Sequence, residues 1–216
     1  MARSRTSKAW MREHTSDIYV QRARQEGWRS RAAYKLIEID AKDKLFKPGL
    51  TVVDLGAAPG GWSQVAARQV GRTGRVVAVD ALEMQAIAGV RFVQGDFNSR
   101  EVREQLVTFL PGGRAHLVIS DMSPNMSGVG IADQARSMAL AEAALEFALQ
   151  TLESSGVFLV KVFQGEGYVE FRAAMAAAFK TVLSRKPAAS RGRSSETYLV
   201  GRDMLPRAVL QPEEQA

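Results

Sequence analysis

The sequence of 216 residues contains no cysteine, which excludes disulfide bonds and thiolate metal sites. This absence fits the reducing cytoplasm, and we expect the protein there. No apolar run approaches the roughly 20 residues that a membrane-spanning helix needs, so we expect no membrane partner. The amino terminus, MARSRTSKAW, is basic without an apolar stretch behind it, unlike a secretory signal.

The positive charge of the chain is concentrated in two places. The formal net charge is +6, and residues 1–35 hold nine lysines and arginines against three acids. A second basic cluster has no acid between its members, which are Lys180, Arg185, Lys186, Arg191 and Arg193. Such clusters are typical of proteins that bind polyanions. Charge alone leaves open the alternative of a solvated basic surface.

Strands and helices alternate along most of the chain. Short apolar runs predict five buried strands, at 51–56, 75–80, 90–97, 115–124 and 156–165. Helical patterns occur at 30–43, with Ser30 as the expected N-cap, and at 61–70, 134–152 and 169–180. Two further runs, 181–187 and 194–203, predict a closing antiparallel pair. The alternation predicts an α/β fold whose mostly parallel sheet is covered by helices on both faces.

A glycine-rich loop follows the first expected strand, in the segment DLGAAPGGWSQ at 54–64. Gly56, Gly60 and Gly61 let the backbone turn sharply and approach a ligand before a helix begins. The spacing is neither G-x-G-x-x-G nor the Gly-Lys-Ser/Thr pattern of a P-loop. A dinucleotide or a nucleoside triphosphate is therefore disfavoured as the ligand.

Two carboxylates are expected at the same edge of the sheet as the glycine loop. Asp80 ends the second expected strand, where it can accept hydrogen bonds from both hydroxyls of a ribose. Asp96 ends the third, within reach of an adenine edge. Ligands of open α/β sheets bind at the carboxyl ends of the strands. The three features together predict a pocket for an adenosyl ligand.

Four segments together resemble one known family: SRAAYKL, VVDLGAAPGGWSQ, SDMSPNMSG and VKVFQGEG. They are similar to the FtsJ-type heat-shock 23S ribosomal RNA (uridine-2'-O)-methyltransferases, from about Ser16 to about Gly201. The resemblance implies a Rossmann-like class I methyltransferase sheet with an antiparallel last strand, S-adenosyl-L-methionine as methyl donor, and no metal. It also implies an acceptor uridine ribose in the A loop of 23S rRNA within the 50S subunit, modified late in ribosome assembly.

Carried over position by position, the resemblance implies two sets of site residues. The cofactor contacts fall on Gly60, Trp62, Asp80, Asp96 and Asp121. The catalytic tetrad falls on Lys35, Asp121, Lys161 and Glu196, with Lys161 as proton acceptor. We expect three segments, which are a basic RNA-contacting segment over 1–30, a catalytic domain over 31–203 and a disordered tail over 204–216. We expect a monomer.

Lys161 lies inside an apolar strand, VFLVKVF, where a charge is costly without a partner. Taken alone, it suits a lysine whose stem packs while its ammonium group reaches solvent. Asp121 and Glu196 supply partners here. Our hypothesis is that Lys161 takes the 2'-hydroxyl proton, that the two carboxylates position it, and that Lys35 caps the site. In the alternative, the tetrad orients the oxygen and the proton leaves late.

RNA capture is assigned to the basic segments. Arg29 and Arg31, the helix of Lys35 and the 185–193 cluster are expected to contact phosphates, so that affinity falls with salt. Trp10 and Trp28 are candidates for stacking on a base, although packing suits them better. Two other functions stay open. One is a nicotinamide-dependent oxidoreductase on a similar sheet, and the other is an RNA-binding assembly protein without activity.

Overall fold

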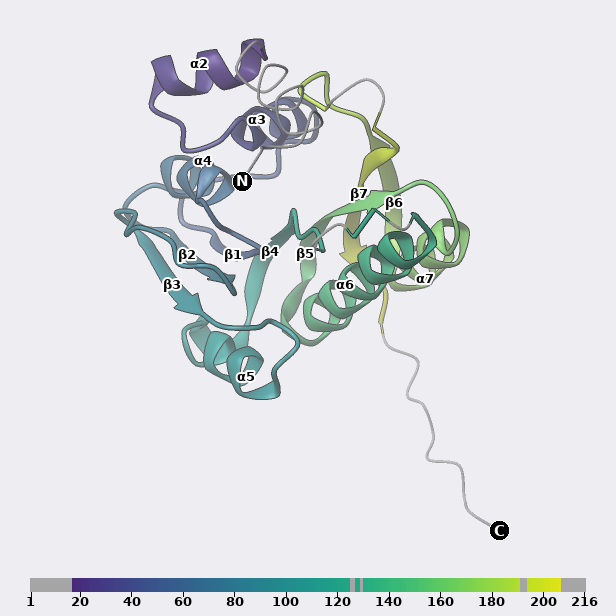
Figure 1. The fold of residues 1–216 in the computed structure, drawn as a ribbon. Coiled ribbons are helices and arrows are strands. Elements are labelled where there is room, and N and C mark those ends of the chain that lie inside the picture. Colours follow the sequence, from purple (N-terminus) through teal and green to yellow (C-terminus); the bar gives the residue numbers. More distant parts are fainter. Residues whose placement is uncertain (1–16, 125–126, 129, 191–193, 207–216) are drawn as a thin grey trace.

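The fold is a single seven-stranded sheet between two layers of helices (Figure 1). The computed structural model describes residues 17–124, 127–128, 130–190 and 194–206. The strands are β1 (Thr51–Leu55), β2 (Arg75–Asp80), β3 (Val90–Gln94), β4 (Ala115–Ser120), β5 (Leu152–Phe163), β6 (Phe179–Arg185) and β7 (Glu196–Met204). The helices are α2 (Ile18–Glu26), α3 (Ala32–Asp43), α4 (Gly61–Val70), α5 (Arg100–Thr108), the 3-10 helix η1 (Pro111–Gly113), α6 (Gly130–Thr151) and α7 (Tyr168–Ala178).

The strand order β3-β2-β1-β4-β5-β7-β6 confirms the predicted Rossmann-like sheet. Strands β1 to β5 pair in parallel, whereas β7 runs antiparallel to both β5 and β6. The predicted closing antiparallel pair is thereby confirmed. Because β1 to β4 are parallel, their carboxyl ends meet at one edge, and the polar residues that follow them are brought together there.

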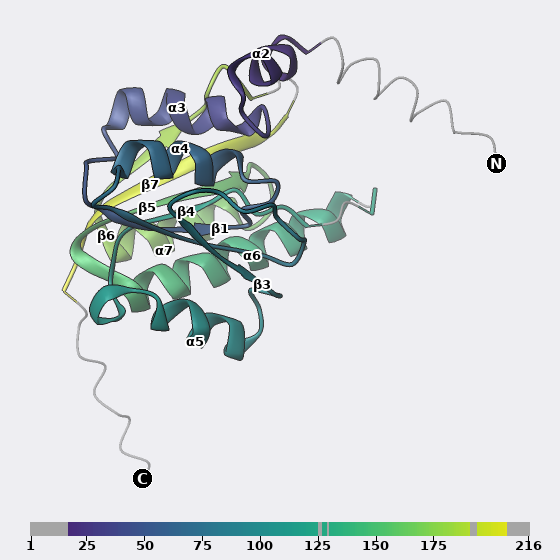
Figure 2. The ribbon, with the colours of Figure 1, turned by 90° about the vertical axis from the view of Figure 1, so that its left-hand side faces the viewer.

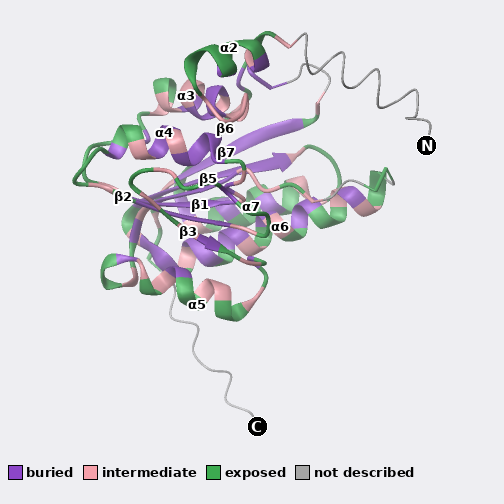
Figure 3. Ribbon diagram, turned by 60° about the vertical axis from the view of Figure 1, so that its left-hand side comes forward, coloured by how far each residue is buried: buried purple, intermediate pink, exposed green. Residues whose placement is uncertain are grey.

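Helices cover both faces of the sheet, as the sequence predicts (Figure 2). Side chains of β1 alternate between two cores, with Val53 and Leu55 facing α5, α6 and α7, and Val52 facing α3 and α4. All five residues of β1 are buried, which is typical of a strand covered on both faces. Figure 3 shows the buried strands enclosed by helices whose outer sides are exposed.

Two short helices, α2 and α5, were not predicted. Only Val20 and Ala23 of α2 and only Leu106 of α5 are buried, so neither helix has a strong apolar stripe. The capping signals were nevertheless present, because Asp17 and Ser99 each accept a hydrogen bond from the first turn of the helix that they precede.

Other boundaries shifted by a few residues. Helix α6 begins at Gly130, four residues before the predicted start, and β3 ends at Gln94 instead of residue 97. The N-cap prediction for Ser30 was wrong. Arg31 holds the cap position of α3 without a side-chain cap bond, while the carbonyl of Ser30 accepts from the amide of Ala33.

Candidate active site

A cavity of about 290 Å³ opens at the carboxyl ends of β1 to β4. Three carboxylates line it, which are Asp80 at the end of β2, Asp96 after β3 and Asp121 after β4. Its remaining walls are formed by Gly56, Ala58, Val79, Ala81, Leu82, Phe97, Met122, Ser123 and Leu140. The cavity therefore combines a ring of hydrogen-bond acceptors with apolar surface, and we call it the cofactor-side cavity.

Two glycines let the loop after β1 approach its neighbours. Gly56 has φ +77°, and a Cβ atom there would lie 2.6 Å from Cγ of Met122, which lines the same cavity. Gly60 has φ +109° and stands at the N-cap of α4, where a Cβ atom would lie 2.7 Å from Cδ1 of Ile87. Any other residue would be strained in backbone and would clash at both positions.

Two of the three carboxylates of the cofactor-side cavity, Asp80 and Asp96, are held by backbone amides. Asp80 accepts hydrogen bonds from the amides of Ala58, at 2.9 Å, and Leu82, at 2.8 Å. Asp96 accepts from the amide of Asn98 at 2.9 Å. A carboxylate offers about four lone-pair positions, so each retains acceptor capacity for a ligand's hydroxyl or amino groups.

The four tetrad residues come from four different elements and form two ion pairs. Lys161 on β5 places its Nζ atom 3.2 Å from Oδ1 of Asp121, beyond β4, and donates to the carbonyl of Asp121 at 2.7 Å. Lys35 on α3 places Nζ 2.7 Å from Oε1 of Glu196, on β7. The structure thus brings together all four residues that the sequence placed in the tetrad.

Tyr198 on β7 connects the two ion pairs. Its hydroxyl group donates to Oδ1 of Asp121 at 2.9 Å, and its ring centroid lies 5.7 Å from Nζ of Lys35. Burial and the carboxylates of Asp121 and Glu196 raise the pKa of Tyr198 well above its ordinary value, so the phenol stays a donor. Burial opposes ionisation of Asp121, but the charges of Lys161 and Lys35 outweigh it and lower the pKa of this carboxyl.

A second pocket of about 270 Å³ adjoins the other ion pair of the tetrad, that of Lys35 and Glu196. It is lined by Arg31, Ala32, Lys35, Phe163, Ser194 and Glu196, and we call it the acceptor-side pocket. Glu196 is fixed within it, because its Oε1 atom also accepts from the hydroxyl of Ser190 at 2.8 Å. The tetrad therefore lies between two cavities, with Asp121 in the wall of one and Lys35 and Glu196 in the wall of the other.

Two predicted cofactor residues, Gly60 and Trp62, lie beside the cofactor-side cavity but not in its wall. The side chain of Trp62 is buried, its Nε1 atom donates to the carbonyl of Ala32 at 2.8 Å, and its ring packs 5.8 Å from that of Tyr198. Trp62 thus joins α4 to α3 and β7. Only its backbone is left to contact a ligand.

Several predicted RNA contacts have partners inside the protein. The guanidinium group of Arg29 donates to the carbonyls of Gln85, at 2.6 Å, and Ala86, at 2.8 Å. Arg31 pairs with Asp17 and donates to the carbonyl of Ala189. The bidentate pair of Arg185 with Asp43 joins β6 to α3. These arginines stabilise the fold around the site.

Of the remaining residues predicted to contact RNA, the structure describes Trp28. Trp28 packs against two hydrophobic clusters, and the guanidinium carbon of Arg68 lies 4.1 Å from the Trp28 ring centroid. Packing was the preferred interpretation of this tryptophan. Trp10, Arg191 and Arg193 lie outside the described residues.

Sequence reasoning missed the residues that support the tetrad, Tyr198 and Ser190. Tyr198 is paired with Lys161 in the β5–β7 register, which the sequence alone does not specify. Asp54 was also missed, although it begins the glycine-loop motif. It is fully buried in β1, and one of its oxygens accepts from the hydroxyl of Ser63 at 2.6 Å.

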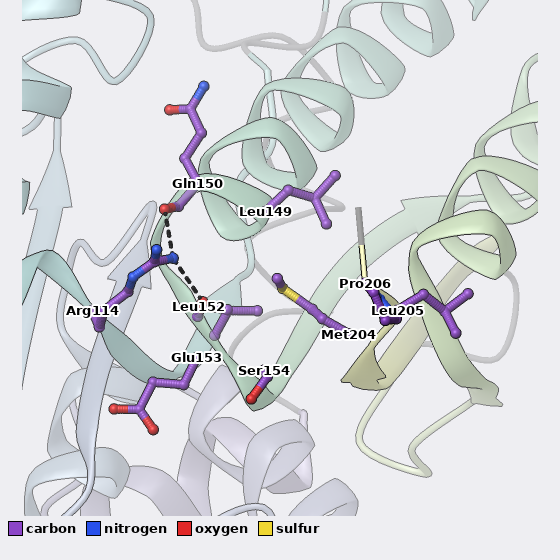
Figure 4. A pocket seen from close by; sticks show the side chains of 9 residues that line it. All are labelled: Arg114, Leu149, Gln150, Leu152, Glu153, Ser154, Met204, Leu205 and Pro206. Carbon is purple, nitrogen blue, oxygen red and sulfur yellow. Dashed lines mark hydrogen bonds between the residues drawn. The ribbon is translucent and has the colours of Figure 1, made fainter. Parts of the chain in front are cut away.

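A larger cavity lies elsewhere, at the amino ends of β4 and β5 (Figure 4). Its volume is about 700 Å³, and its lining residues are Arg114, Leu149, Gln150, Leu152, Glu153, Ser154, Met204, Leu205 and Pro206. The Nη1 atom of Arg114 donates to the carbonyls of Gln150 and Leu152, both at 3.2 Å. This guanidinium therefore caps the end of α6.

The described part of the chain has neither a cluster of metal ligands nor a candidate membrane span. No group of three or more histidines, aspartates or glutamates is arranged to hold a metal ion. No helix is long and apolar enough to cross a membrane.

Known proteins resemble this chain over nearly its whole length. Ribosomal RNA large subunit methyltransferase E of Nitrosospira multiformis is 60% identical over 201 residues, which are 93% of this chain and 98% of that protein. The protein of the same name from Dechloromonas aromatica is 61% identical over 204 residues, which are 94% of this chain and all of that protein.

Solved structures show the same fold. A chain described as a ribosomal RNA methyltransferase from Plasmodium falciparum has a TM-score of 0.74 and 29% identity, and the match covers 83% of this chain and all of that one. Fibrillarin of Methanococcus jannaschii, a pre-rRNA processing protein, has a TM-score of 0.51 at 12% identity, covering 72% of this chain and 67% of that one, which shows the fold alone.

The family model for FtsJ-like methyltransferases matches residues 28–204, a span that holds the glycine loop, both cavities and all four tetrad residues. This match excludes the nicotinamide-dependent oxidoreductase. The resemblance stated from the sequence is confirmed, and the chain belongs to the FtsJ-like methyltransferase family.

Proposed function

We propose that this protein transfers a methyl group from S-adenosyl-L-methionine to the 2'-hydroxyl of a uridine in the A loop of 23S rRNA. The position of the tetrad between two cavities carries the proposal, because a cofactor on one side and a ribose on the other can meet at Lys161. The curated relatives, at about 60% identity, are named as large-subunit rRNA methyltransferases. Their names support the RNA class of substrate.

The cofactor-side cavity fits the methyl donor. Carboxylates suit the hydroxyls of a ribose and the amino groups of adenine and methionine, and we assign these contacts to Asp80, Asp96 and Asp121. Gly56 keeps the cavity open where a side chain would fill it. We assign backbone contacts to Gly60 and Trp62. When bound, the donor supplies a methyl group on a positively charged sulfur, and no metal is needed.

The tetrad would position the acceptor oxygen and manage its proton. As the oxygen–methyl bond forms and the carbon–sulfur bond breaks, the hydroxyl proton must leave. We assign its uptake to Nζ of Lys161 in its neutral form, so the ammonium group paired with Asp121 must first release its own proton to solvent. Asp121 holds this nitrogen in place, and Tyr198 holds Asp121. Lys35 and Glu196 orient the ribose from the acceptor-side pocket. Holding both reactants in line is itself a large part of the catalysis.

The described parts of the two basic clusters lie close together, which supports one RNA-binding face. Ala23 of α2, Tyr34 of α3 and Ala189 pack together, and Glu38 accepts from the amides of Ala188 and Ala189. We assign RNA capture to this face and to residues 1–30. The catalytic domain is assigned to residues 31–203, and no role is assigned to residues 204–216.

The RNA substrate also defines the setting that we propose. The acceptor would be 23S rRNA within the 50S subunit, methylated in the cytoplasm late in ribosome assembly, by a monomer. In the remaining alternative, the protein assists assembly without catalysis. The intact tetrad argues against this alternative, because a binding protein has no need of two buried ion pairs beside a cofactor cavity.

The test is to incubate the protein with radiolabelled S-adenosyl-L-methionine and large ribosomal subunits from cells that lack it. We expect label on a single A-loop nucleotide. Naked rRNA in a parallel reaction shows whether the assembled subunit is required. Cofactor binding without label on either RNA would contradict the proposed function and leave only the cavity assignment.

A further inference from the structure

The acceptor-side pocket contains one aromatic ring, that of Phe163 at the end of β5. This residue follows Lys161 by two positions, so both side chains stand on the same face of the strand. Nζ of Lys161 lies 5.9 Å from the centroid of the Phe163 ring. An aromatic surface therefore lies beside Nζ of Lys161, where we place the acceptor oxygen.

Phe163 differs from the other phenylalanines of this protein. All nine lie in the described part of the chain, and eight of them belong to a hydrophobic cluster or pack against one. Phe163 belongs to none of these clusters and is only half-buried. A core role therefore does not explain a phenylalanine at this position.

The backbone around Phe163 is held in place from two sides. The side-chain amide of Gln134, in the first turns of α6, donates to the carbonyls of Phe163 at 3.2 Å and Glu166 at 2.9 Å. The amide of Gln164 donates to the carbonyl of Ser195 at 3.0 Å. The ring is thus carried by a fixed strand end, as a preorganised contact requires.

We propose that the base of the acceptor nucleotide stacks on Phe163 while its ribose lies against Lys161. This inference rests on the proposed function and adds the residue that holds the base. Proteins recognise RNA bases outside a helix by stacking them on aromatic side chains. Aromatic rings pair at centroid distances of about 4.5–7 Å, and the 2'-oxygen is only a few bonds from the base, so both contacts can be made together.

The proposal limits what Phe163 does. Every base has a π-face, so stacking tolerates any base. Phe163 would therefore select an acceptor nucleotide that is unpaired and turned out of its helix, rather than select uridine. Methylation should consequently depend on the pairing of the acceptor more than on its identity.

The experiment measures steady-state kinetics of Phe163→Ala with subunits as substrate, beside Phe163→Tyr and the control Phe109→Ala. Phe109 is also half-buried with a guanidinium over its ring, that of Arg91, but it lies far from the tetrad. We expect kcat/KM for RNA to fall roughly 5- to 150-fold in Phe163→Ala. The affinity for S-adenosyl-L-methionine should not change, and Phe163→Tyr should regain most of the loss.

A second measurement locates the base directly. RNA carrying 5-iodouridine at the methylated position is irradiated in complex with the wild-type protein, and the crosslinked peptide is identified by mass spectrometry. We expect the crosslink on Phe163. Wild-type methylation together with an unchanged kcat/KM in Phe163→Ala, or a crosslink elsewhere, would overturn the stacking proposal and leave the proposed function intact. No wild-type methylation of any RNA would instead remove the proposed function.

Discussion

The two ends of the sheet carry cavities of opposite character. The cavity at the amino ends of β4 and β5 is the larger, at about 700 Å³, and the cofactor-side cavity at the carboxyl ends measures about 290 Å³. The large one has a single guanidinium, Arg114, whose hydrogen bonds run to backbone carbonyls at the end of α6 and the start of β5. The small one gathers three carboxylates and adjoins two ion pairs.

The end of the sheet where charged side chains converge is therefore the functional end of this fold. The volume of a cavity does not identify it. Carboxyl ends of parallel strands bring together residues from distant parts of the chain. At the amino ends, the same architecture leaves a groove between a helix end and two strands (Figure 4). Variants at the two ends should therefore differ sharply in their effect on catalysis.

The largest expected effect is that of Lys161→Ala. Loss of the proton acceptor should lower kcat by roughly 10²–10⁴-fold, while affinity for S-adenosyl-L-methionine stays close to that of the wild type. The variant also leaves Asp121 without its closest charge, so its folding must be checked by circular dichroism. Near-normal turnover by a folded Lys161→Ala protein would remove the tetrad from the mechanism.

The next effect concerns pH and Asp54, which lies beneath the cofactor-side cavity. Burial raises the pKa of Asp54 to about 7, and the charges of Asp121 and Asp80 add to it. The folded state therefore holds a proton that the unfolded state releases near pH 4. The stability that this proton contributes is complete below about pH 4 and is lost as the pH rises through about 7. The loss is about 4 kcal/mol, at 1.36 kcal/mol per pKa unit.

Urea unfolding of the wild type and of Asp54→Asn at several pH values between about 4 and 8 measures this loss. In the asparagine variant, the fall in unfolding free energy over that range should largely disappear. Asp121 has the opposite shift and contributes stability that is lost as pH falls, so it cannot imitate the effect. The same pH slope in both proteins would show that Asp54 is already ionised in the folded state.

A smaller effect is expected for Asp80→Asn. The amide keeps the shape of the side chain and one acceptor oxygen, but it removes the negative charge. Hydrogen bonds from ribose hydroxyls to a charged acceptor are worth about 1.5–3 kcal/mol, which sets the expected loss of binding free energy. The dissociation constant of S-adenosyl-L-methionine, measured by calorimetry, should rise roughly 10- to 150-fold. The KM for RNA serves as the internal control and should change little. An unaltered cofactor affinity would move the ribose away from β2.

The smallest effect is expected for Arg114→Ala, at the other end of the sheet. Loss of its two long hydrogen bonds, one exposed and one partly buried, should lower the unfolding free energy by about 1 kcal/mol or less. Methyl transfer should stay within about two-fold of the wild type, because no residue of this cavity contacts the tetrad. A large loss of activity with an intact fold would contradict this assignment. It would mean that the larger cavity, and not the end where charged side chains converge, is the functional one.

The sheet was predictable because its signals are local. Runs such as TVVDL and RVVAVD are mostly apolar, and both form strands of the parallel sheet whose central residues are buried. Helices α2 and α5 escaped prediction because they bury few residues and depend on their caps. The antiparallel pair of β6 and β7 was predicted from the residues and the antiparallel last strand from the resemblance, whereas the pairing of β7 with β5 was not predicted.

The site was predictable in its charged residues but not in its supports. Asp80, Asp96 and Asp121 end or follow strands, a position that the sequence reveals. The link from Tyr198 to Asp121 depends on strand register, and the half-exposed position of Phe163 depends on the loops around it. Arg29 and Arg31 were assigned to RNA from charge alone, and the structure gives them partners within the protein.

Locating the transferred methyl group is the most direct test of methylation at a ribose 2'-hydroxyl. Subunits methylated by the wild-type protein are digested to nucleosides, and tandem mass spectrometry separates the sugar fragment from the base fragment. We expect the added mass on the ribose of one nucleoside, identified as 2'-O-methyluridine. After reaction with Lys161→Ala, we expect no added mass. A methyl group on the base fragment would contradict methylation at the ribose.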